Sequence, residues 1–256
     1  MQDTKVKFKV HTGTIIGSEH QRRQVNNQDG FSVGEAEIRN KYYWWGVVCD
    51  GCSMGRQSEV GAVLLSNYLC EEVPYLLSSG STIPEIPDQL FIAGLGYLRS
   101  LAAHTAMSGF RKQLEFIEHH LLCTVIGFVI NDEKCLLFNA GDGVFIVNNN
   151  IHRIKQDNKP LYMAYHLLDK SILDLSEPIP FKFETSIMLV SALERIAVCS
   201  DGIEDGIVDQ LWGHDHPFGL QRRLRVLRLQ KKAVFSDDCT VVALEKIHSE
   251  GEEYGN

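Results

Sequence analysis

The chain has 256 residues, 44% of them apolar, and a formal net charge of −8. The apolar content suffices for a substantial folded core, whereas the negative charge disfavours nucleic acid and anionic membranes as partners. The longest strongly apolar stretch, residues 121–130, is too short to span a bilayer, and the N-terminal residues alternate charge with apolar side chains, unlike a signal peptide. We therefore expect a cytoplasmic protein with no nucleic-acid or membrane partner.

The first half of the chain predicts strands followed by helices. Three segments place β-branched and aromatic residues between glycine, asparagine and charged breaks, and we expect three antiparallel strands over residues 6–16, 30–38 and 42–49. Apolar residues then recur at steps of three and four, which predicts helices over 60–73, 88–104 and 110–121. Pro74 is expected to end the first of these helices.

The second half returns to strands, which we expect over residues 124–130, 135–139, 143–147 and 151–154. Residues 155–184 are polar and irregular and contain Pro160, Pro178 and Pro180, so this segment is expected to form a flap over a site. The remaining elements are a buried strand, a short helix, a longer helix and a closing strand, over residues 195–200, 201–210, 218–232 and 240–245.

This order of elements indicates segregated α and β layers, because strands and helices occur in blocks instead of alternating βαβ units. We expect an α+β fold, a four-layer α-β-β-α sandwich of two antiparallel sheets flanked by helices. The sequence contains no Gly/Ser linker and no repeat, so we expect a single domain over residues 1–248. The acidic tail, residues 249–256, is expected to be disordered.

Aspartates recur where predicted strands end. Three apolar runs end in Asp-Gly, at Asp50-Gly51, Asp142-Gly143 and Asp201-Gly202, and further aspartates lie in Asn27-Gln28-Asp29 and Asp237-Asp238. At a strand end a carboxylate can leave the core without burying an unpaired charge, and glycine permits a close approach or a sharp turn. One Asp-Gly is most simply a hairpin turn. The set together predicts carboxylates around hard divalent cations.

Taken in order, these motifs and Thr240 resemble the metal-dependent type 2C protein phosphatases, the PPM family. The resemblance spans about residues 13–245, and it is greatest to a bacterial branch whose first motif runs here from His20 to Asp29. It implies a serine/threonine protein phosphatase that uses Mn²⁺ or Mg²⁺, with a phosphoserine or phosphothreonine protein as substrate and a cognate kinase as partner. In this mechanism a water that bridges two ions attacks phosphorus directly, without a phosphoenzyme.

The resemblance also assigns roles to individual residues. Asp50 would bridge two ions, and the Gly51 carbonyl would add a ligand. Asp201 and Asp237 would complete the shell of the first ion, Asp29 would hold the water ligands of the second, and Asp142 with Asp201 would bind a weaker third. Asp50, Asp201 and Asp29 are thereby the candidate catalytic residues, whereas Thr240 is expected to pack or hydrogen-bond.

Three positions depart from the family pattern. Gln28 stands where many members carry glutamate, Gln24 where they carry a phosphate-gripping arginine, and Cys52 where some carry a histidine acid. Arg23 and Arg56 are the remaining candidates for binding the substrate phosphate. The departures leave two alternatives open: a regulatory or binding module with weak or no turnover, and a phosphatase of small metabolites.

Other features have simpler interpretations. The seven cysteines lie mostly in apolar runs and read as reduced core residues, although Cys49-x-x-Cys52 could be a redox pair or half of a zinc site. The basic stretch 222–232 is either a solvated helix face or a docking surface for an acidic phosphoprotein or nucleic acid. Trp44 and Trp45 are expected to point to opposite faces of one strand.

Overall fold

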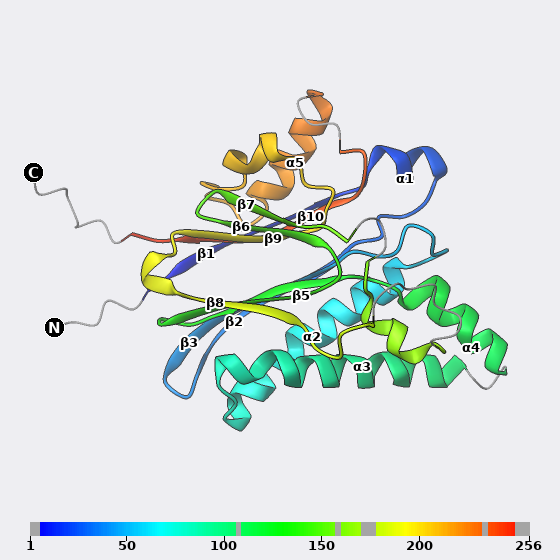
Figure 1. Ribbon diagram of the computed structural model, residues 1–256. Helices are drawn as coiled ribbons and strands as arrows, with labels where there is room; N and C mark the ends of the chain where they lie inside the picture. Colours follow the sequence, from blue (N-terminus) through cyan, green and yellow to red (C-terminus); the bar gives the residue numbers. More distant parts are fainter. Residues whose placement is uncertain (1–5, 106–108, 157–159, 170–177, 232–234, 249–256) are drawn as a thin grey trace, which may run out of the picture.

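The structure is a computed structural model that describes residues 6–105, 109–156, 160–169, 178–231 and 235–248. Two antiparallel sheets of five strands each face one another, and helices cover their outer sides (Figure 1). The first sheet has the order β1-β10-β9-β6-β7 and the second β2-β3-β4-β5-β8. The predicted α+β class, with two antiparallel sheets flanked by helices, is confirmed.

The strands follow the predicted ones closely. Those of the first sheet are β1 (Phe8–Ile15), β6 (Gly143–Val147), β7 (Asn150–Ile154), β9 (Arg195–Cys199) and β10 (Cys239–Lys246). Those of the second are β2 (Gly30–Ile38), β3 (Lys41–Cys49), β4 (Val125–Ile130), β5 (Lys134–Ala140) and β8 (Glu184–Leu189).

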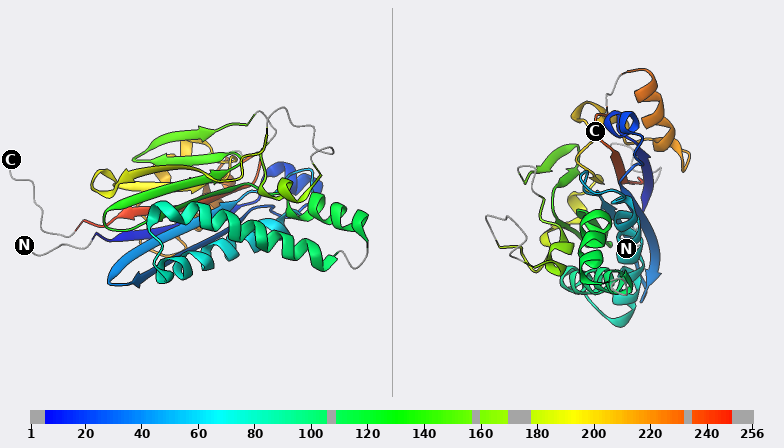
Figure 2. Two further views of the ribbon diagram at one scale, coloured as in Figure 1. Left: turned by 60° about the horizontal axis from the view of Figure 1, so that its bottom comes forward. Right: turned by 90° about the vertical axis from the view of Figure 1, so that its right-hand side faces the viewer.

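The helices form the two outer layers, as the turned views in Figure 2 make clear. On the second sheet lie α2 (Glu59–Ser79), α3 (Ile86–Thr105) and α4 (Phe110–Phe116), which ends in a π-helical turn (Ile117–Leu121). On the first sheet lies α5 (Gly219–Leu229), and the short α1 (Ser18–Arg23) follows β1. Single 3₁₀ turns occur at Ile83–Glu85, Met163–Leu167, Val190–Ala192 and Asp205–Gln210. None of these helices combines the length and apolarity that a bilayer span requires.

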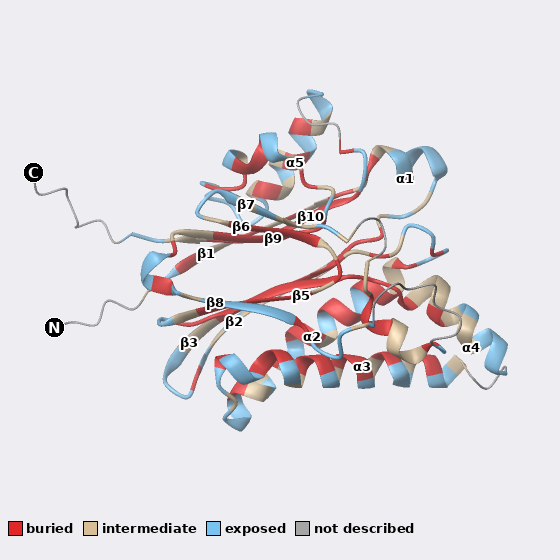
Figure 3. Ribbon diagram, viewed as in Figure 1, coloured by how far each residue is buried: buried red, intermediate tan, exposed pale blue. Residues whose placement is uncertain are grey.

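Apolar residues fill three clusters, one between the sheets and one under each helical layer. The inner strands of both sheets are accordingly buried over most of their length, whereas the edge strand β8 is largely exposed (Figure 3). Trp44 belongs to the cluster between the sheets, whereas Trp45 belongs to the cluster under α2 and α3. The predicted division of the two tryptophans between opposite faces is confirmed.

Two predictions about the N-terminal half need correction. The three N-terminal strands do not pair together, because β1 pairs with β10 along its whole length, whereas β2 pairs with β3. The segment between β1 and β2 contains α1 and is too long for a tight hairpin. The two strands can therefore lie in different sheets although they are neighbours in the sequence.

Pro74 does not end the first long helix, since α2 continues to Ser79. A residue at position 74 would normally donate its N–H to the carbonyl of Cys70, and proline cannot. The Cys70 carbonyl instead accepts a hydrogen bond of 2.8 Å from the indole Nε1 of Trp45. The helix therefore tolerates the proline because a strand side chain replaces the missing donor.

Other differences are smaller. The helix expected over 201–210 is a 3₁₀ turn that begins at Asp205, and β8 and α1 were not predicted. Of the expected flap, residues 157–159 and 170–177 lie outside the described residues, as does the acidic tail 249–256. The single-domain boundary stays a prediction.

Candidate metal centre

The predicted aspartates converge at one end of the sandwich. Asp50 and Asp201 follow β3 and β9, Asp142 follows β5, and Asp29 and Asp237 precede β2 and β10. Burial raises the pKa of Asp50 well above its usual range, and the negative charges of the other four aspartates raise it further. The structure therefore brings together carboxyl groups from five separate parts of the chain.

These carboxyl groups perturb one another in the same direction. Burial raises the pKa of Asp142 to about 6, and the charge of Asp201 adds to the shift. The pKa of Asp201 is also raised, by burial and by Asp237, and a hydrogen bond with Asp50 opposes the shift in part. Crowded carboxyl groups of this kind resist ionisation unless a cation compensates their charge.

Asp29 is the most enclosed of the predicted ligands. Its Oδ2 accepts a hydrogen bond of 2.8 Å from Ser200 Oγ, and Thr240 bonds to the same carboxyl group. Its Oδ1 is buried and has no hydrogen-bond partner among the described residues. Burial, with the charge of Asp238 contributing, raises the pKa of Asp29 to about 7. One oxygen is thus fixed by hydroxyl groups and the other is available.

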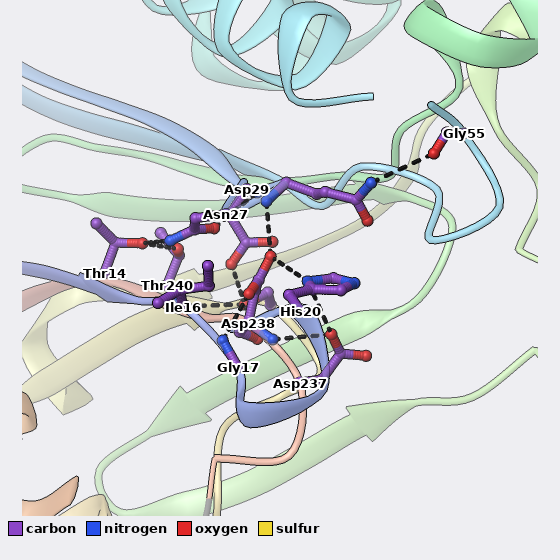
Figure 4. Close-up of polar contacts among 12 residues, drawn as sticks. Thr14, Ile16, Gly17, His20, Asn27, Asp29, Gly55, Asp237, Asp238 and Thr240 are labelled. Atoms are coloured by element: carbon purple, nitrogen blue, oxygen red, sulfur yellow. Dashed lines mark hydrogen bonds and ion pairs between the residues drawn. The ribbon is translucent and has the colours of Figure 1, made fainter. Parts of the chain in front are cut away.

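Asp238 has a different role, although it is adjacent to Asp237. Its Oδ1 accepts the Gly17 N–H at 2.6 Å, and its Oδ2 accepts the Gln28 N–H at 2.6 Å and lies 2.8 Å from His20 Nδ1 (Figure 4). These contacts fasten the segment between β1 and β2 to the start of β10. The sequence places Asp238 beside Asp237 in the same acidic motif, and the separate role of Asp238 becomes clear only from its contacts.

His20, Asp237 and Asp238 also offer ligand atoms that lie within 4.8 Å of one another. The two oxygens of Asp238 already accept hydrogen bonds from two amide groups and contact His20 Nδ1. We therefore interpret this triad as a contact that stabilises the fold. The side chain of Asp237 is 52% exposed, and its Oδ1 accepts the N–H of Asp238 at 2.8 Å.

Glycine beside the aspartates permits close contact between chain segments. A Cβ on Gly202 would lie 2.0 Å from the Asp238 carbonyl oxygen, and one on Gly51 would lie 2.6 Å from the Gln28 carbonyl oxygen. Both distances are too short for any side chain. The Asp-Gly pairs at Asp50 and Asp201 are therefore explained by close backbone approach between the segments that carry the carboxylates.

Arg153, on β7, is a residue that sequence analysis missed. Its Nη1 donates to the Asp201 carbonyl oxygen at 3.2 Å, and its Nη2 lies 2.6 Å from Asp205 Oδ1. Its positive charge lowers the pKa of Asp201 against the larger upward shift. A single arginine in an alternating strand belongs to no motif, so its role could not be predicted from the sequence.

The positions that depart from the family pattern are also placed. Gln24 is exposed and closes α1 in the left-handed region, with φ of 56°. Gln28 is buried, and its Oε1 has no hydrogen-bond partner in the part of the chain that the structure describes. Cys52 is half-buried and hydrogen-bonded to Tyr162, which comes from the described part of the expected flap.

Arg23 and Arg56 are both exposed. Their role in binding the substrate phosphate stays a prediction.

The donor set fits hard divalent cations. It consists of oxygens only, it holds an unpartnered buried carboxylate oxygen on Asp29, and its members raise one another's pKa. Mg²⁺ and Mn²⁺ favour carboxylate and carbonyl oxygens over nitrogen or sulfur. The Cys49 and Cys52 thiols form no disulfide, and neither do the other five cysteines.

The fold and this centre define an α+β protein with a carboxylate-rich site at one end of a two-sheet sandwich. The sequence profile described as protein phosphatase 2C matches residues 16–233, and the chain belongs to this family. No curated protein sequence matches the chain.

Solved structures of bacterial phosphatases share the fold. A bacterial serine phosphatase superposes with a TM-score of 0.56 at 14% identity, covering 96% of this chain and 99% of its own. The serine/threonine phosphatase Stp1 from Staphylococcus aureus gives 0.55 at 16% identity, with 96% of each chain covered. The catalytic domain of the serine/threonine protein phosphatase PstP, in complex with two manganese ions, gives 0.52 at 15% identity, with 95% and 99% covered.

Proposed function

We propose that the protein is a Mn²⁺- or Mg²⁺-dependent serine/threonine protein phosphatase that hydrolyses phosphomonoesters directly. The observation that carries this proposal is the convergence of four other aspartates on Asp50, together with a buried oxygen of Asp29 that has no hydrogen-bond partner among the described residues. The family match and the manganese ions of PstP support it.

In the proposed site Asp50, Asp201 and Asp237 would hold one ion. Asp50 with the Gly51 carbonyl would hold a second, whose water ligands Asp29 would orient. Asp142 with Asp201 offers a third, weaker position. When bound, the ions supply an activated water as nucleophile and neutralise charge on the phosphoryl oxygens.

The chain's other residues keep these ligands in place. Ser200 and Thr240 fix one oxygen of Asp29, and Ser200 Oγ in turn accepts the Thr240 N–H at 2.8 Å. Asp238 and His20 hold the loop that carries Gln28 and Asp29. Arg23 or Arg56 would grip the substrate phosphate in place of the family arginine that Gln24 replaces.

The proposed substrate is a phosphoserine or phosphothreonine protein, modified by a cognate kinase. Seven free cysteines fit a reducing compartment, so we place the reaction in the cytoplasm.

The test is hydrolysis of p-nitrophenyl phosphate, phosphothreonine peptides and small phosphorylated metabolites with Mn²⁺. Asp50→Ala and Asp201→Ala should lose activity on the order of 10³-fold, because several kcal/mol of charge stabilisation disappears. Asp132→Ala, an exposed change in the turn between β4 and β5, should keep it. Equal background rates in all four proteins would favour the regulatory module, and turnover of metabolites alone would favour a metabolite phosphatase.

A further inference from the structure

The strand β8 lies at the edge of the second sheet, and the hydrogen-bonding groups on its outer side have no backbone partner among the described residues. It pairs with β5 on one side, and the described strands include no partner on its other side. The Val190 N–H donates to the Glu133 carbonyl oxygen at 3.0 Å, one step beyond the pair formed by Leu189 and Lys134. Because bonded and non-bonded positions alternate in an antiparallel ladder, Thr185, Ile187 and Leu189 turn their N–H and C=O groups outward.

The strand lacks the features that usually protect an edge from pairing. Its sequence, Glu-Thr-Ser-Ile-Met-Leu, contains no proline and no lysine, and its one charge is at the first position. The side chains of Ile187 and Leu189 are 48% and 64% exposed. An apolar, unpaired edge of this kind accepts a further extended strand readily.

A groove accompanies this edge. It has a volume of about 510 Å³ and is lined by Pro84, Pro87, Asp88 and the residues 182–185. Thr185 is opposite Phe138, which belongs to the cluster under the helices, so Thr185 shares the helical face of the sheet. A strand added beside β8 would direct alternate side chains to this same face, into the groove.

The edge also leads toward the metal centre. Glu184, the first residue of β8, is opposite Asn139, and Asp142 follows Asn139 by three residues, which limits their separation to about 10 Å. Glu184 and Lys182 line a second, small pocket together with Gly141, next to Asp142. A chain paired with β8 would therefore pass close to the site where a phosphoryl group is hydrolysed.

We propose that an extended segment of the phosphoprotein substrate adds to β8 as a sixth strand, with an apolar side chain in the groove beside Pro84 and Pro87. This proposal rests on the proposed phosphatase function and names the surface that selects its substrate. Main-chain hydrogen bonds to Thr185, Ile187 and Leu189 provide affinity, and the groove provides the preference for side chains.

The test compares two variants at one position. Ile187→Pro removes an outward N–H without breaking a bond to β5, whereas Ile187→Ala keeps the N–H and loses only the side chain. On a phosphothreonine peptide with valine at alternate flanking positions, Ile187→Pro should raise KM about tenfold or more and Ile187→Ala by less. Hydrolysis of p-nitrophenyl phosphate, which is too small to pair with a strand, should be unchanged in both. An unchanged KM for the peptide would overturn the proposal.

A second measurement does not depend on turnover or on the proline variant. Amide hydrogen exchange of Asp50→Ala with the same peptide should slow at Thr185, Ile187 and Leu189, and an N-methylated peptide should not slow it. Absence of peptide-dependent protection would overturn docking, whereas loss of p-nitrophenyl phosphate hydrolysis in the wild type would refute the phosphatase function separately. Sedimentation as a dimer that Ile187→Pro converts to monomer would show that a second copy, not substrate, occupies the edge.

Discussion

The interior of the sandwich and its carboxylate end are built from the same strands, yet burial has opposite consequences in the two regions. In the interior, Val48 of β3 and Val198 of β9 are fully buried between the sheets, where each apolar side chain stabilises the fold by about 1.5–3 kcal/mol. A few residues further on, burial raises the pKa of Asp50 and Asp201. A buried apolar side chain in the middle of a strand thus stabilises the fold, whereas a buried carboxyl group just beyond the end of the strand is harder to ionise.

The aspartates at the carboxylate end of the sandwich differ in their surroundings. Asp238 is satisfied by donors from the protein, whereas Asp29 keeps one unpartnered oxygen and Asp50 is surrounded by negative charge. Asp238 therefore stabilises the fold, whereas Asp29 and Asp50 are the proposed ion ligands. Each prediction below changes one side of this contrast.

The largest expected effect is on the free energy of unfolding, and it distinguishes a residue of the interior from a residue of the site. Phe128→Ala, in the cluster between the sheets, should cost about 3–5 kcal/mol in the free energy of unfolding. Asp50→Ala should leave the metal-free protein as stable as the wild type or more stable, because it removes a charge that four aspartates repel. Urea unfolding in EDTA measures both, and a large loss of stability in Asp50→Ala would contradict the contrast.

The next effect concerns the structural aspartate. Asp238→Ala should destabilise the protein by about 3–5 kcal/mol, because it leaves His20 and two amide groups without their buried partner. Asp237→Ala serves as the matched control at the neighbouring position and should cost far less stability while it weakens Mn²⁺ binding. Similar unfolding midpoints for the two variants would show that the division of roles is wrong.

A graded effect of pH should follow from Asp29. Its folded-state pKa is raised from 3.8 to about 7. Protonation of Asp29 therefore stabilises the folded state. This contribution to the free energy of unfolding is complete below the unfolded-state pKa and is lost as pH rises through about 7. In EDTA, the melting temperature of the wild type should therefore fall relative to Asp29→Asn as pH rises from about 4 to about 8. Saturating Mn²⁺ should remove the difference, and a difference independent of pH would be evidence against it.

The smallest expected effect on stability concerns Trp45, in the apolar interior. Trp45→Phe should cost about 1–3 kcal/mol, because the Cys70 carbonyl loses its donor inside the protein. Pro74→Ala restores a helical N–H that can reach the same carbonyl. The double variant should recover part of the loss in a thermal unfolding cycle, whereas strictly additive costs would show that the two residues are not coupled.

Much of this organisation could be predicted from sequence because it depends on local patterns. Alternating and helical periodicities give the layers, and strand-ending aspartates such as Asp50 and Asp201 mark the residues that converge. Their role as metal ligands stays a prediction. The edge strand β8 escaped prediction since its side chains are largely exposed and carry little periodic burial.

The contacts that complete the site could not be predicted because they join distant residues of ordinary type. His20 meets Asp238 across 218 positions, and Arg153 reaches Asp201 from a strand with no motif. The path of α2 through Pro74 likewise depends on Trp45, which lies in another element. Such pairs are fixed by the fold, not by their neighbours in the sequence.

Crystals grown with Mn²⁺ test the central claim most directly, by locating manganese from its anomalous scattering. The carboxylates of Asp50, Asp201 and Asp237 should enclose one manganese peak, and a second should lie beside Asp50 and the Gly51 carbonyl. Manganese found only at His20 and Asp238, or none bound beside Asp50, would contradict the claim that these aspartates form a divalent cation site.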